Sequence, residues 1–500
     1  MKKYSLLFFI ACVSFSMYAQ SPASVWYFGQ NAGVDFSYGS PKALSDGQLN
    51  TEEGCVTISD QKGVLLFYTD GVSVWNAQHK RMPNGSGLFG SPSSTSSGVV
   101  IQHPGNPNQF FLFTVPATAD TAGFRYSMVD MKLDSGRGDI LPSLKNIKLK
   151  HPVTEKLTST LHRNGKDYWI LLHEWMSDVF IAYRITAQGL QTEPVLSSGG
   201  SVHNGTTLNT QGYMKVNPDG TNVALALEES NVIELFDFDN ESGKVSAPIS
   251  MSLPQGSYVY GIEFSPDGSL LYVSAAGTGE IFQYNLQAGS EEAIRASATL
   301  IGATNPKAWV GALQIAMDGK IYFTVYKTPY LGVIENPNIP GIGCGFNQQA
   351  VELQGRLSTL GLPTFSQHFF YQQENKKIEY FNEAKVVKGK SLVLKNILFD
   401  FAKATLKPSS SVELDKVVRA MKADPTLKVK IAGHTDNIGN KSFNMTLSKN
   451  RAKAVSDYLI NKGIAASSIT TEGYGSSVPV AGNDTDAGRA LNRRVEILFQ

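Results

Sequence analysis

An arginine within the apolar face of a predicted helix is the most unusual chemical feature of this 500-residue sequence. The spacing of apolar residues predicts a helix from about 444 to 462. Its apolar stripe is formed by Leu447, Val455, Tyr458 and Leu459. Arg451 lies in the middle of this stripe, where a guanidinium group is costly unless a carboxylate meets it. We therefore expect Arg451 to have an acidic partner.

Asp436 is the natural candidate for that partner. It closely follows a predicted strand in which Leu427, Val429 and Ile431 alternate with lysines, and strand ends are where α/β sheets present ligand-binding groups. Two interpretations follow from the residues alone. The pair is either a structural ion pair that fixes the helix on the sheet, or a dipolar pocket that binds the ammonium and carboxylate of one zwitterionic ligand.

The elements that position this pair belong to a C-terminal unit, predicted over residues 389–500. Changes in apolar periodicity predict the order β-α-β-α-β-β, an α+β sheet covered by helices on one side. A capping box, Ser410 to Glu413, predicts the start of the first helix, which ends before Pro425. A polar linker is predicted over residues 373–388.

Four segments of this unit resemble the OmpA-like peptidoglycan-binding domain. They are FDFAKATL (399–406), GHTDNIGNKSFNMTLSKNRAKAVSDYLINKGI (433–464), GYG (473–475) and GRALNRRVEI (488–497). The resemblance implies non-covalent binding of the diaminopimelate side chain in the peptidoglycan stem peptide. On the matching positions, Asp436 takes the ligand's ammonium group and Arg451 its carboxylate.

Further pocket residues follow from the same resemblance. Asn444 and Arg493 match positions that line the pocket, and Thr435 and Asn437 belong to the surrounding loop. Ala402 departs from relatives that have a polar residue in the first loop. His434 is expected to form hydrogen bonds within its loop rather than to bind a metal. No cofactor and no metal is expected in the chain.

Residues 20–372 repeat a different theme, a polar turn followed by a short strand rich in β-branched and aromatic residues. Asp-Gly and Asn-Gly pairs in the turns supply the positive φ that tight hairpins need. The six units span residues 59–71, 104–115, 163–174, 217–227, 265–274 and 316–325. Short strands at this spacing are typical of an all-β propeller of four-stranded blades.

The number of blades, six or seven, is open. The strands predicted at Val25–Phe28 and His368–Tyr371 could share one blade and close the ring as a seventh. Cys55 and Cys344 would then lie in the first and last units. Either they form a disulfide, which an exported protein allows, or they are two free buried thiols.

The N-terminal region also resembles the propellers of gliding bacteria that use type IX secretion. Its matching segments are WYFG (26–29), AGVDF (32–36), LLFYTDG (65–71), MPNG (82–85) and GLP (361–363). The resemblance implies a scaffold and no particular reaction. The C-terminal secretion signal of that family is replaced by the OmpA-like unit, which favours retention in the periplasm.

Composition limits the function classes. The chain carries 44 Lys and Arg, 43 Asp and Glu and 42% hydrophobic residues, which excludes a disordered tail protein. Residues 389–500 hold 17 basic against 10 acidic residues, and residues 20–388 hold 25 against 33. After residues 1–19, which match a signal peptide, no apolar run is long enough to span a membrane.

These observations predict a non-catalytic periplasmic scaffold, bound to the cell wall, that tethers a protein-docking propeller to peptidoglycan. Its propeller partners are unknown envelope proteins, with the secretion or gliding machinery as candidates, and any outer-membrane association runs through them. No nucleic acid is expected to bind. The alternative is a cell-wall-localised propeller enzyme or a carbohydrate-binding sensor. Carboxylates and histidines that converge on the propeller's central channel would favour that alternative.

Overall fold

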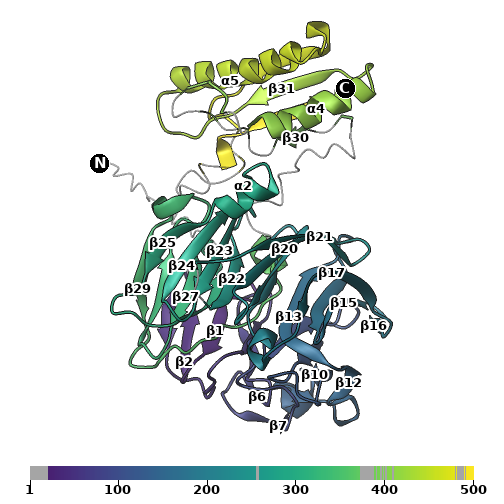
Figure 1. Ribbon diagram of the computed structural model, residues 1–500, viewed down its shortest axis with the longest axis vertical. Coiled ribbons are helices and arrows are strands. Elements are labelled where there is room, and N and C mark those ends of the chain that lie inside the picture. Colours follow the sequence, from purple (N-terminus) through teal and green to yellow (C-terminus); the bar gives the residue numbers. More distant parts are fainter. Residues whose placement is uncertain are drawn as a thin grey trace, which may run out of the picture.

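The computed structural model describes residues 21–254, 258–371, 388–389, 391–394, 397, 399, 403–407, 410–478, 480, 489 and 491–500. The predicted signal peptide, all of the predicted linker except Lys388, and Ala402 lie outside these residues. The described chain has a mostly β N-terminal region and a C-terminal region with both helices and strands (Figure 1). None of its described helices combines the length and apolar character needed to cross a membrane.

Seven small antiparallel sheets make up the described N-terminal region, and each consists of strands that are consecutive in the sequence. The first sheet contains β1 (Val25–Phe28), β2 (Ala32–Asp35) and β3 (Lys42–Leu44). The second contains β4 (Val56–Ser59), β5 (Leu65–Thr69), β6 (Ser73–Asn76) and β7 (Arg81–Ser86). The third contains β8 (Gly98–Gln102), β9 (Gln109–Thr114), β10 (Phe124–Asp130), β11 (Asp139–Ile140) and β12 (Ile147–Lys150).

The other four sheets continue this pattern along the chain. The fourth contains β13 (Val153–Leu161), β14 (Tyr168–Glu174), β15 (Ser177–Thr186), β16 (Gly189–Leu190) and β17 (Val195–His203). The fifth contains β18 (Met214–Val216), β19 (Asn222–Leu227), β20 (Val232–Asp239) and β21 (Lys244–Met251). The sixth contains β22 (Val259–Phe264), β23 (Leu270–Ala275), β24 (Glu280–Asn285) and β25 (Thr299–Ala303). The seventh contains β26 (Val310–Ile315), β27 (Ile321–Val325), β28 (Tyr330–Ile334) and β29 (Phe346–Glu352).

Short helical segments connect some of these strands. The α-helical ones are α1 (Leu133–Gly136), α2 (Glu291–Ala296) and α3 (His368–Tyr371). The 3₁₀ turns are η1 (Pro142–Leu144), η2 (Thr207–Thr210) and η3 (Gly341–Cys344). The strand predicted at His368–Tyr371 is therefore wrong, because this segment is α3.

The six predicted hairpin turns are confirmed, and each joins the first two strands of a different sheet. The turn between β4 and β5 shows how the local sequence builds them. One carboxylate oxygen of Asp60 accepts hydrogen bonds from the backbone N–H groups of Lys62 and Val64. Gly63 adopts a φ of 77°, a conformation that glycine tolerates without a steric penalty.

The first strands of consecutive sheets lie next to one another, in the order β1, β4, β8, β13, β18, β22 and β26. A buried polar network ties three of these strands together. Lys215 of β18 forms an ion pair of 3.2 Å with Glu263 of β22 and donates a hydrogen bond to Gln314 of β26. Gln367 donates to both carboxylate oxygens of Glu263, at 3.2 Å each. Both charged side chains are almost fully buried, so each needs such partners.

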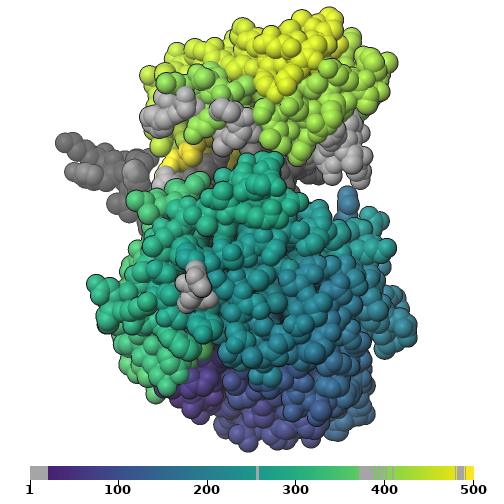
Figure 2. All heavy atoms as spheres, viewed as in Figure 1, coloured from purple at the N-terminus to yellow at the C-terminus, as the bar shows by residue number. Residues whose placement is uncertain are grey.

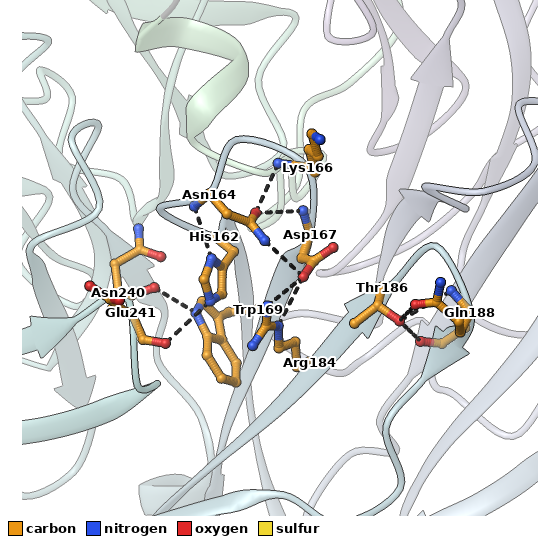
Figure 3. A network of polar contacts seen from close by, with 11 residues as sticks. His162, Asn164, Lys166, Asp167, Trp169, Arg184, Thr186, Gln188, Asn240 and Glu241 are labelled. Atoms are coloured by element: carbon orange, nitrogen blue, oxygen red, sulfur yellow. Dashed lines mark hydrogen bonds and ion pairs between the residues drawn. The ribbon is translucent and has the colours of Figure 1, made fainter.

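Hydrogen bonds also join the first hairpin of the fourth sheet to a turn of the fifth sheet (Figure 3). The indole N–H of Trp169 donates to the backbone carbonyl of Asn240 at 3.0 Å, and the Asn240 side chain donates to the carbonyl of Leu161 at 3.0 Å. His162 Nε2 lies 3.2 Å from the carbonyl oxygen of Glu241. The fourth and fifth sheets therefore contact each other here as well as through β13 and β18.

The segment from 357 to 364 brings the end of the N-terminal region back to its beginning. The backbone N–H of Leu360 donates to Glu52 O at 2.9 Å, and Leu360 O accepts from the N–H of Ala312 at 2.7 Å. Gly361 lies so close to the backbone of Glu53 that a Cβ atom on the glycine would lie 1.8 Å from the Glu53 carbonyl oxygen. In Figure 2 the purple start of the region accordingly lies beside its green end.

Cys55 and Cys344 are both free and buried, so the disulfide that the sequence left open is not present. Cys55 packs in the cluster that contains Trp26 and Tyr213, whereas Cys344 packs in a separate cluster beside Tyr272. Burial raises the pKa of both thiols, which keeps them protonated and unreactive. The alternative of two buried free thiols is therefore the correct one.

The C-terminal region has the element order β-α-β-α-β-β that the sequence predicts. Its elements are β30 (Ser391–Val393), α4 (Ser411–Ala423), β31 (Val429–Gly433), α5 (Lys441–Asn461), the 3₁₀ turn η5 (Ala466–Ser468), β32 (Ile469–Gly473) and β33 (Val495–Phe499). The sheet order is β30-β33-β31-β32, and only β31 and β32 are parallel. Ser410 lies at the N-cap of α4 and the helix ends before Pro425, as predicted, but the predicted capping bond is wrong, since the Ser410 side chain makes no capping hydrogen bond.

One hydrophobic core joins both long helices to the sheet. Leu414 and Val417 of α4 and Val455 of α5 pack with strand residues such as Ile431 and Ile497, and all five are fully buried. The other sheet face carries polar side chains, including Lys430 and Glu472. The helices therefore anchor the strand ends from which the candidate site is built.

We expect the buried thiols to be inert in the folded protein. In the chain that begins at residue 20, a thiol reagent such as Ellman's should label neither cysteine before unfolding and both afterwards. A reducing agent should leave the melting temperature unchanged, because no disulfide is present to break. Labelling of the native protein, or a melting temperature lowered by reductant, would contradict this expectation.

Candidate functional site

The loop after β31 presents Asp436 in a buried but polar setting. The residue is 8% exposed, and its Oδ1 accepts a hydrogen bond from the backbone N–H of Ile438 at 3.0 Å. Thr435 supports the loop from both sides: its N–H donates to Gly475 O at 2.9 Å and its hydroxyl to Asp436 O at 3.0 Å. These bonds orient the carboxylate before any ligand arrives. Asn437 lies exposed in the same loop.

Asn444 holds this loop against the first turns of α5. Its side-chain amide donates to the backbone carbonyls of Asp436 (3.3 Å) and Ile438 (3.0 Å), and the residue is only 2% exposed. The helix itself begins three residues earlier than expected, at Lys441. The signal that could have predicted this start is Asn440, whose side chain caps the helix by accepting from the N–H of Phe443 at 2.8 Å.

The direct ion-pair partner of Asp436 is Arg493. Arg493 Nη1 lies 2.7 Å from Asp436 Oδ2, and the Arg493 side chain is 43% exposed. The expectation that Arg451 would be this partner is therefore wrong. The two partners lie 57 residues apart in the sequence, so only the pairing of β31 with β33 brings them together.

Arg451 nevertheless lies beside this pair, within the core side of α5. The residue is 7% exposed, its Nε donates to Lys403 O at 3.1 Å, and its guanidinium lies 4.8 Å from the ring centre of Phe399. Burial lowers the pKa of Arg451 and the charge of Arg493 lowers it further, while Asp436 raises it. Among the residues that the structure describes, no carboxylate lies within ion-pair distance of Arg451.

Two glycines allow α5 to approach the strand ends closely enough to form this site. A Cβ atom on Gly433 would lie 2.1 Å from Ser448 O, and one on Gly473 would lie 2.4 Å from the backbone nitrogen of Lys449. Any larger residue would push the helix away from β31 and β32. The glycines thus set the position of Arg451 relative to Asp436.

The site therefore combines one carboxylate with two guanidinium groups in a partly enclosed loop cluster. The structure brings together Asp436, Asn444, Arg493 and Thr435 by direct contact and places Arg451 within electrostatic reach. Such a cluster can accept N–H donors at the carboxylate and offer N–H donors to an anion. Within the described ranges, no group of three or more His, Cys, Asp and Glu side chains could hold a metal ion.

His434 does not form the hydrogen bonds expected of it. The side chain is 2% exposed and stacks on Tyr474 with ring centres 5.2 Å apart, and neither ring nitrogen has a hydrogen-bond partner. Its Nε2 lies 3.6 Å from Glu496, too far for a hydrogen bond. Burial lowers the pKa of His434 to about 4, with a further lowering by Arg494 and an opposing effect of Glu496.

Comparison with known proteins places the site in a recognised domain. Residues 398–493 match the OmpA family. A segment of this chain is 46% identical over 101 residues to outer membrane porin F of Pseudomonas fluorescens, and covers 20% of this chain and 31% of that protein. Another is 47% identical over 95 residues to the peptidoglycan-binding protein ArfA of Mycobacterium bovis, covering 19% of this chain and 29% of that protein.

A solved structure also resembles part of the chain. The crystal structure of the peptidoglycan-associated lipoprotein from Burkholderia pseudomallei is 28% identical and covers 21% of this chain and 88% of that one, with a TM-score of 0.20. This TM-score is too low to establish a shared overall structure. The matched part of the chain spans less than a third of the length of each of these two curated relatives.

We expect Asn444→Ala to lower the free energy of unfolding of the C-terminal domain by about 1–3 kcal/mol, because the buried carbonyl of Asp436 and the partly buried carbonyl of Ile438 lose their donor. Asn461→Ala, at the exposed end of the same helix, is the matched control and should change it by less than about 0.5 kcal/mol. Chemical denaturation of the whole chain, followed at the transition of this domain, measures both. Equal effects of the two variants would contradict the role given to Asn444.

Stability should also depend on the protonation of His434. Since its folded pKa of about 4 lies below the ordinary 6.5, the unfolded chain binds more protons between these values and stability falls as the pH drops through them. His434→Phe keeps an aromatic ring against Tyr474 but cannot titrate. From pH 7 to pH 5 the wild type should lose roughly 1–3 kcal/mol more than the variant in denaturation experiments. Equal losses would show that His434 does not titrate in this way.

Proposed function

Because its C-terminal part is an OmpA-family domain, we propose that this chain binds peptidoglycan non-covalently through the free end of diaminopimelate. The observation that carries the proposal is the cluster of one buried carboxylate, Asp436, with the guanidinium groups of Arg451 and Arg493. The free end of diaminopimelate carries one ammonium and one carboxylate group. Its recognition therefore needs both signs of charge at a fixed separation, as this cluster supplies.

Each charged group then has a role in binding. Asp436 receives the ligand's ammonium, since its Oδ1 and Oδ2 already accept from N–H donors. Arg451 receives the carboxylate, because a planar guanidinium can pair with it bidentately, which an ammonium cannot do. Arg493 is partly exposed, so its guanidinium can donate to Asp436, to the ligand's carboxylate or to both. Asn444, Thr435 and Asn437 shape the loop around the ligand.

We also propose that the seven N-terminal sheets are the blades of one closed β-propeller. The adjacency of their first strands and the contacts between their turns support this arrangement. Closure is supported by the contact of the first and last sheets, where the rings of Trp26 and Tyr322 lie 6.2 Å apart. The segment 357–364 runs between them and is bonded to Glu52 and Ala312. In a closed ring each blade packs its faces against two neighbours and only short sheet edges remain.

The whole chain is then a non-catalytic periplasmic scaffold. The signal peptide predicted at residues 1–19 exports it, the C-terminal domain tethers it to the cell wall, and the propeller docks envelope proteins, for which the secretion or gliding machinery are candidates. A second candidate, a ligand-binding sensor or a cell-wall-localised enzyme, is favoured by one observation. Glu53, Glu155 and Glu228 converge where the first strands of several sheets meet.

The tether is tested by sedimenting the chain from residue 20 with isolated cell-wall sacculi. The wild type should pellet, whereas Asp436→Ala and Arg451→Ala should lose about 2–5 kcal/mol of binding free energy, because each leaves a buried charge unpaired. Arg451→Lys should be nearly as damaging as Arg451→Ala, since lysine keeps the charge but not the planar fork. A lysine variant that binds like wild type would contradict the bidentate contact.

Exposed residues of the same helix provide matched controls. Asp457 and Lys453 form a surface ion pair of 2.7 Å on α5, and Asp457→Ala and Lys453→Ala should pellet as the wild type does. Circular dichroism should show every variant folded. Should the folded wild type itself stay in solution, the charge cluster would be a structural ion pair and the tether would be wrong.

A further inference from the structure

Buried polar side chains from several consecutive sheets gather in the N-terminal region. Glu53 lies in the loop before β4, Glu155 and Lys156 lie in an irregular stretch of β13, and Glu228 follows β19. The rings of Tyr213 and Tyr260 lie 5.5 Å apart beside them. All six residues are at least nine-tenths buried. Such a concentration of ionisable groups is unusual in a protein interior.

Two members of this cluster are fully provided with partners. Glu155 accepts hydrogen bonds from the backbone N–H groups of Thr95 and Thr118, both at 2.8 Å, and from the hydroxyls of Thr95 and Thr210. The ammonium of Lys156 donates to three backbone carbonyls, those of Asn209, Thr210 and Gln211, at 3.2, 3.1 and 2.6 Å. These hydrogen bonds therefore hold the side chains of Glu155 and Lys156 in place within the cluster.

The other four members each have a buried side-chain oxygen without a hydrogen bond of normal geometry. Oε2 of Glu53 and Oε2 of Glu228 are buried and make no hydrogen bond, and the two residues are only 6% and 9% exposed. The hydroxyl of Tyr213 faces the backbone of Leu362 and that of Tyr260 faces Thr95, but neither makes a hydrogen bond of normal geometry. Native proteins seldom leave buried polar atoms unpaired, so a ligand with N–H or O–H donors would complete these atoms.

The electrostatics of the cluster indicate the charge of that ligand. Burial raises the pKa of Glu53 to about 9, and the charges of Glu155, Glu228 and Glu52 add to the effect. Burial also raises the pKa of Glu228 to about 7, with Lys156 opposing. A cation placed among these carboxyl groups would allow them to ionise and would supply the missing donors.

We propose that Glu53 and Glu228, with the hydroxyls of Tyr213 and Tyr260, form a binding site for a protonated primary amine. An ammonium group has three N–H donors, which match two carboxylate oxygens and a tyrosine hydroxyl. Among the described residues no set of three His, Cys, Asp and Glu side chains is close enough to hold a metal, so an organic cation fits better than a metal ion. A neutral sugar would bring no charge to favour ionisation of these carboxyl groups.

The surroundings favour approach of such a cation. Glu52 and Glu229, the chain neighbours of the two unpaired glutamates, are both exposed, so each buried carboxyl group has an acidic neighbour at the surface. The amine can belong to a small molecule or to a lysine side chain of a docked protein, and both share the same chemistry. The inference is independent of the peptidoglycan tether, because it concerns the other end of the chain.

Isothermal titration calorimetry on the chain from residue 20 tests the site. The probes are methylammonium, a lysine peptide acetylated at its N-terminus, the same peptide with its lysine acetylated, Mg²⁺ and N-acetylglucosamine. We expect methylammonium or the lysine peptide to bind and the acetylated peptide not to bind. Glu53→Gln should weaken binding at least tenfold, whereas Glu241→Gln, whose side chain is 73% exposed and remote from the cluster, should leave it unchanged.

The pH dependence separates binding from a merely structural role. The cation binds the ionised form of Glu53, so affinity should rise by up to about tenfold per pH unit between pH 6 and pH 8, with release of a proton to the buffer. Binding of methylammonium identifies a small-molecule site, and binding of the lysine peptide alone identifies a protein partner. The proposal is overturned if neither amine binds, if Glu53→Gln binds as tightly as wild type, or if only Mg²⁺ or the sugar binds.

Discussion

Burial of charged groups is the constraint on which both regions of this chain depend. A charge in a protein interior must be paired, hydrogen-bonded or neutralised, and each cluster here meets the requirement differently. Lys215 and Glu263 are paired directly, and this pair ties three neighbouring strands together. At the C-terminal site Asp436 is paired with Arg493. The nearby Arg451 uses its Nε to donate to the Lys403 carbonyl and has no carboxylate partner among the described residues.

Much of the C-terminal site could be predicted from the sequence. The apolar stripe of α5 and the alternation in β31 were enough to place Arg451 in the core and Asp436 at a strand end beside it. The pairing with Arg493 could not be predicted from the residues alone, because it depends on how β33 lies against β31. The close approach of α5 at Gly433 is likewise a property of packing that no local pattern encodes.

The N-terminal region shows the same division. Turn chemistry predicted six hairpins correctly, since Asp-Gly and Asn-Gly pairs act within a few residues. The return of the chain at 357–364 was missed, because its bonds to Glu52 and Ala312 join segments far apart in the sequence. The fates of Cys55 and Cys344 depend on the same long-range packing, which assigns the two thiols to separate clusters.

The contrast between the two charge clusters bears on how the regions work together. The C-terminal cluster is cationic in excess, with two guanidinium groups to one carboxylate, and lies in the basic part of the chain. The N-terminal cluster holds three carboxyl groups, Glu53, Glu155 and Glu228, against the single amine of Lys156, and Glu53 ionises at neutral pH only with a cation beside it. Ligands that complete them must therefore differ in charge, so one ligand cannot occupy both sites equally well. On the two proposals above, the C-terminal domain holds the chain at the cell wall while the N-terminal region exchanges a second, cationic partner.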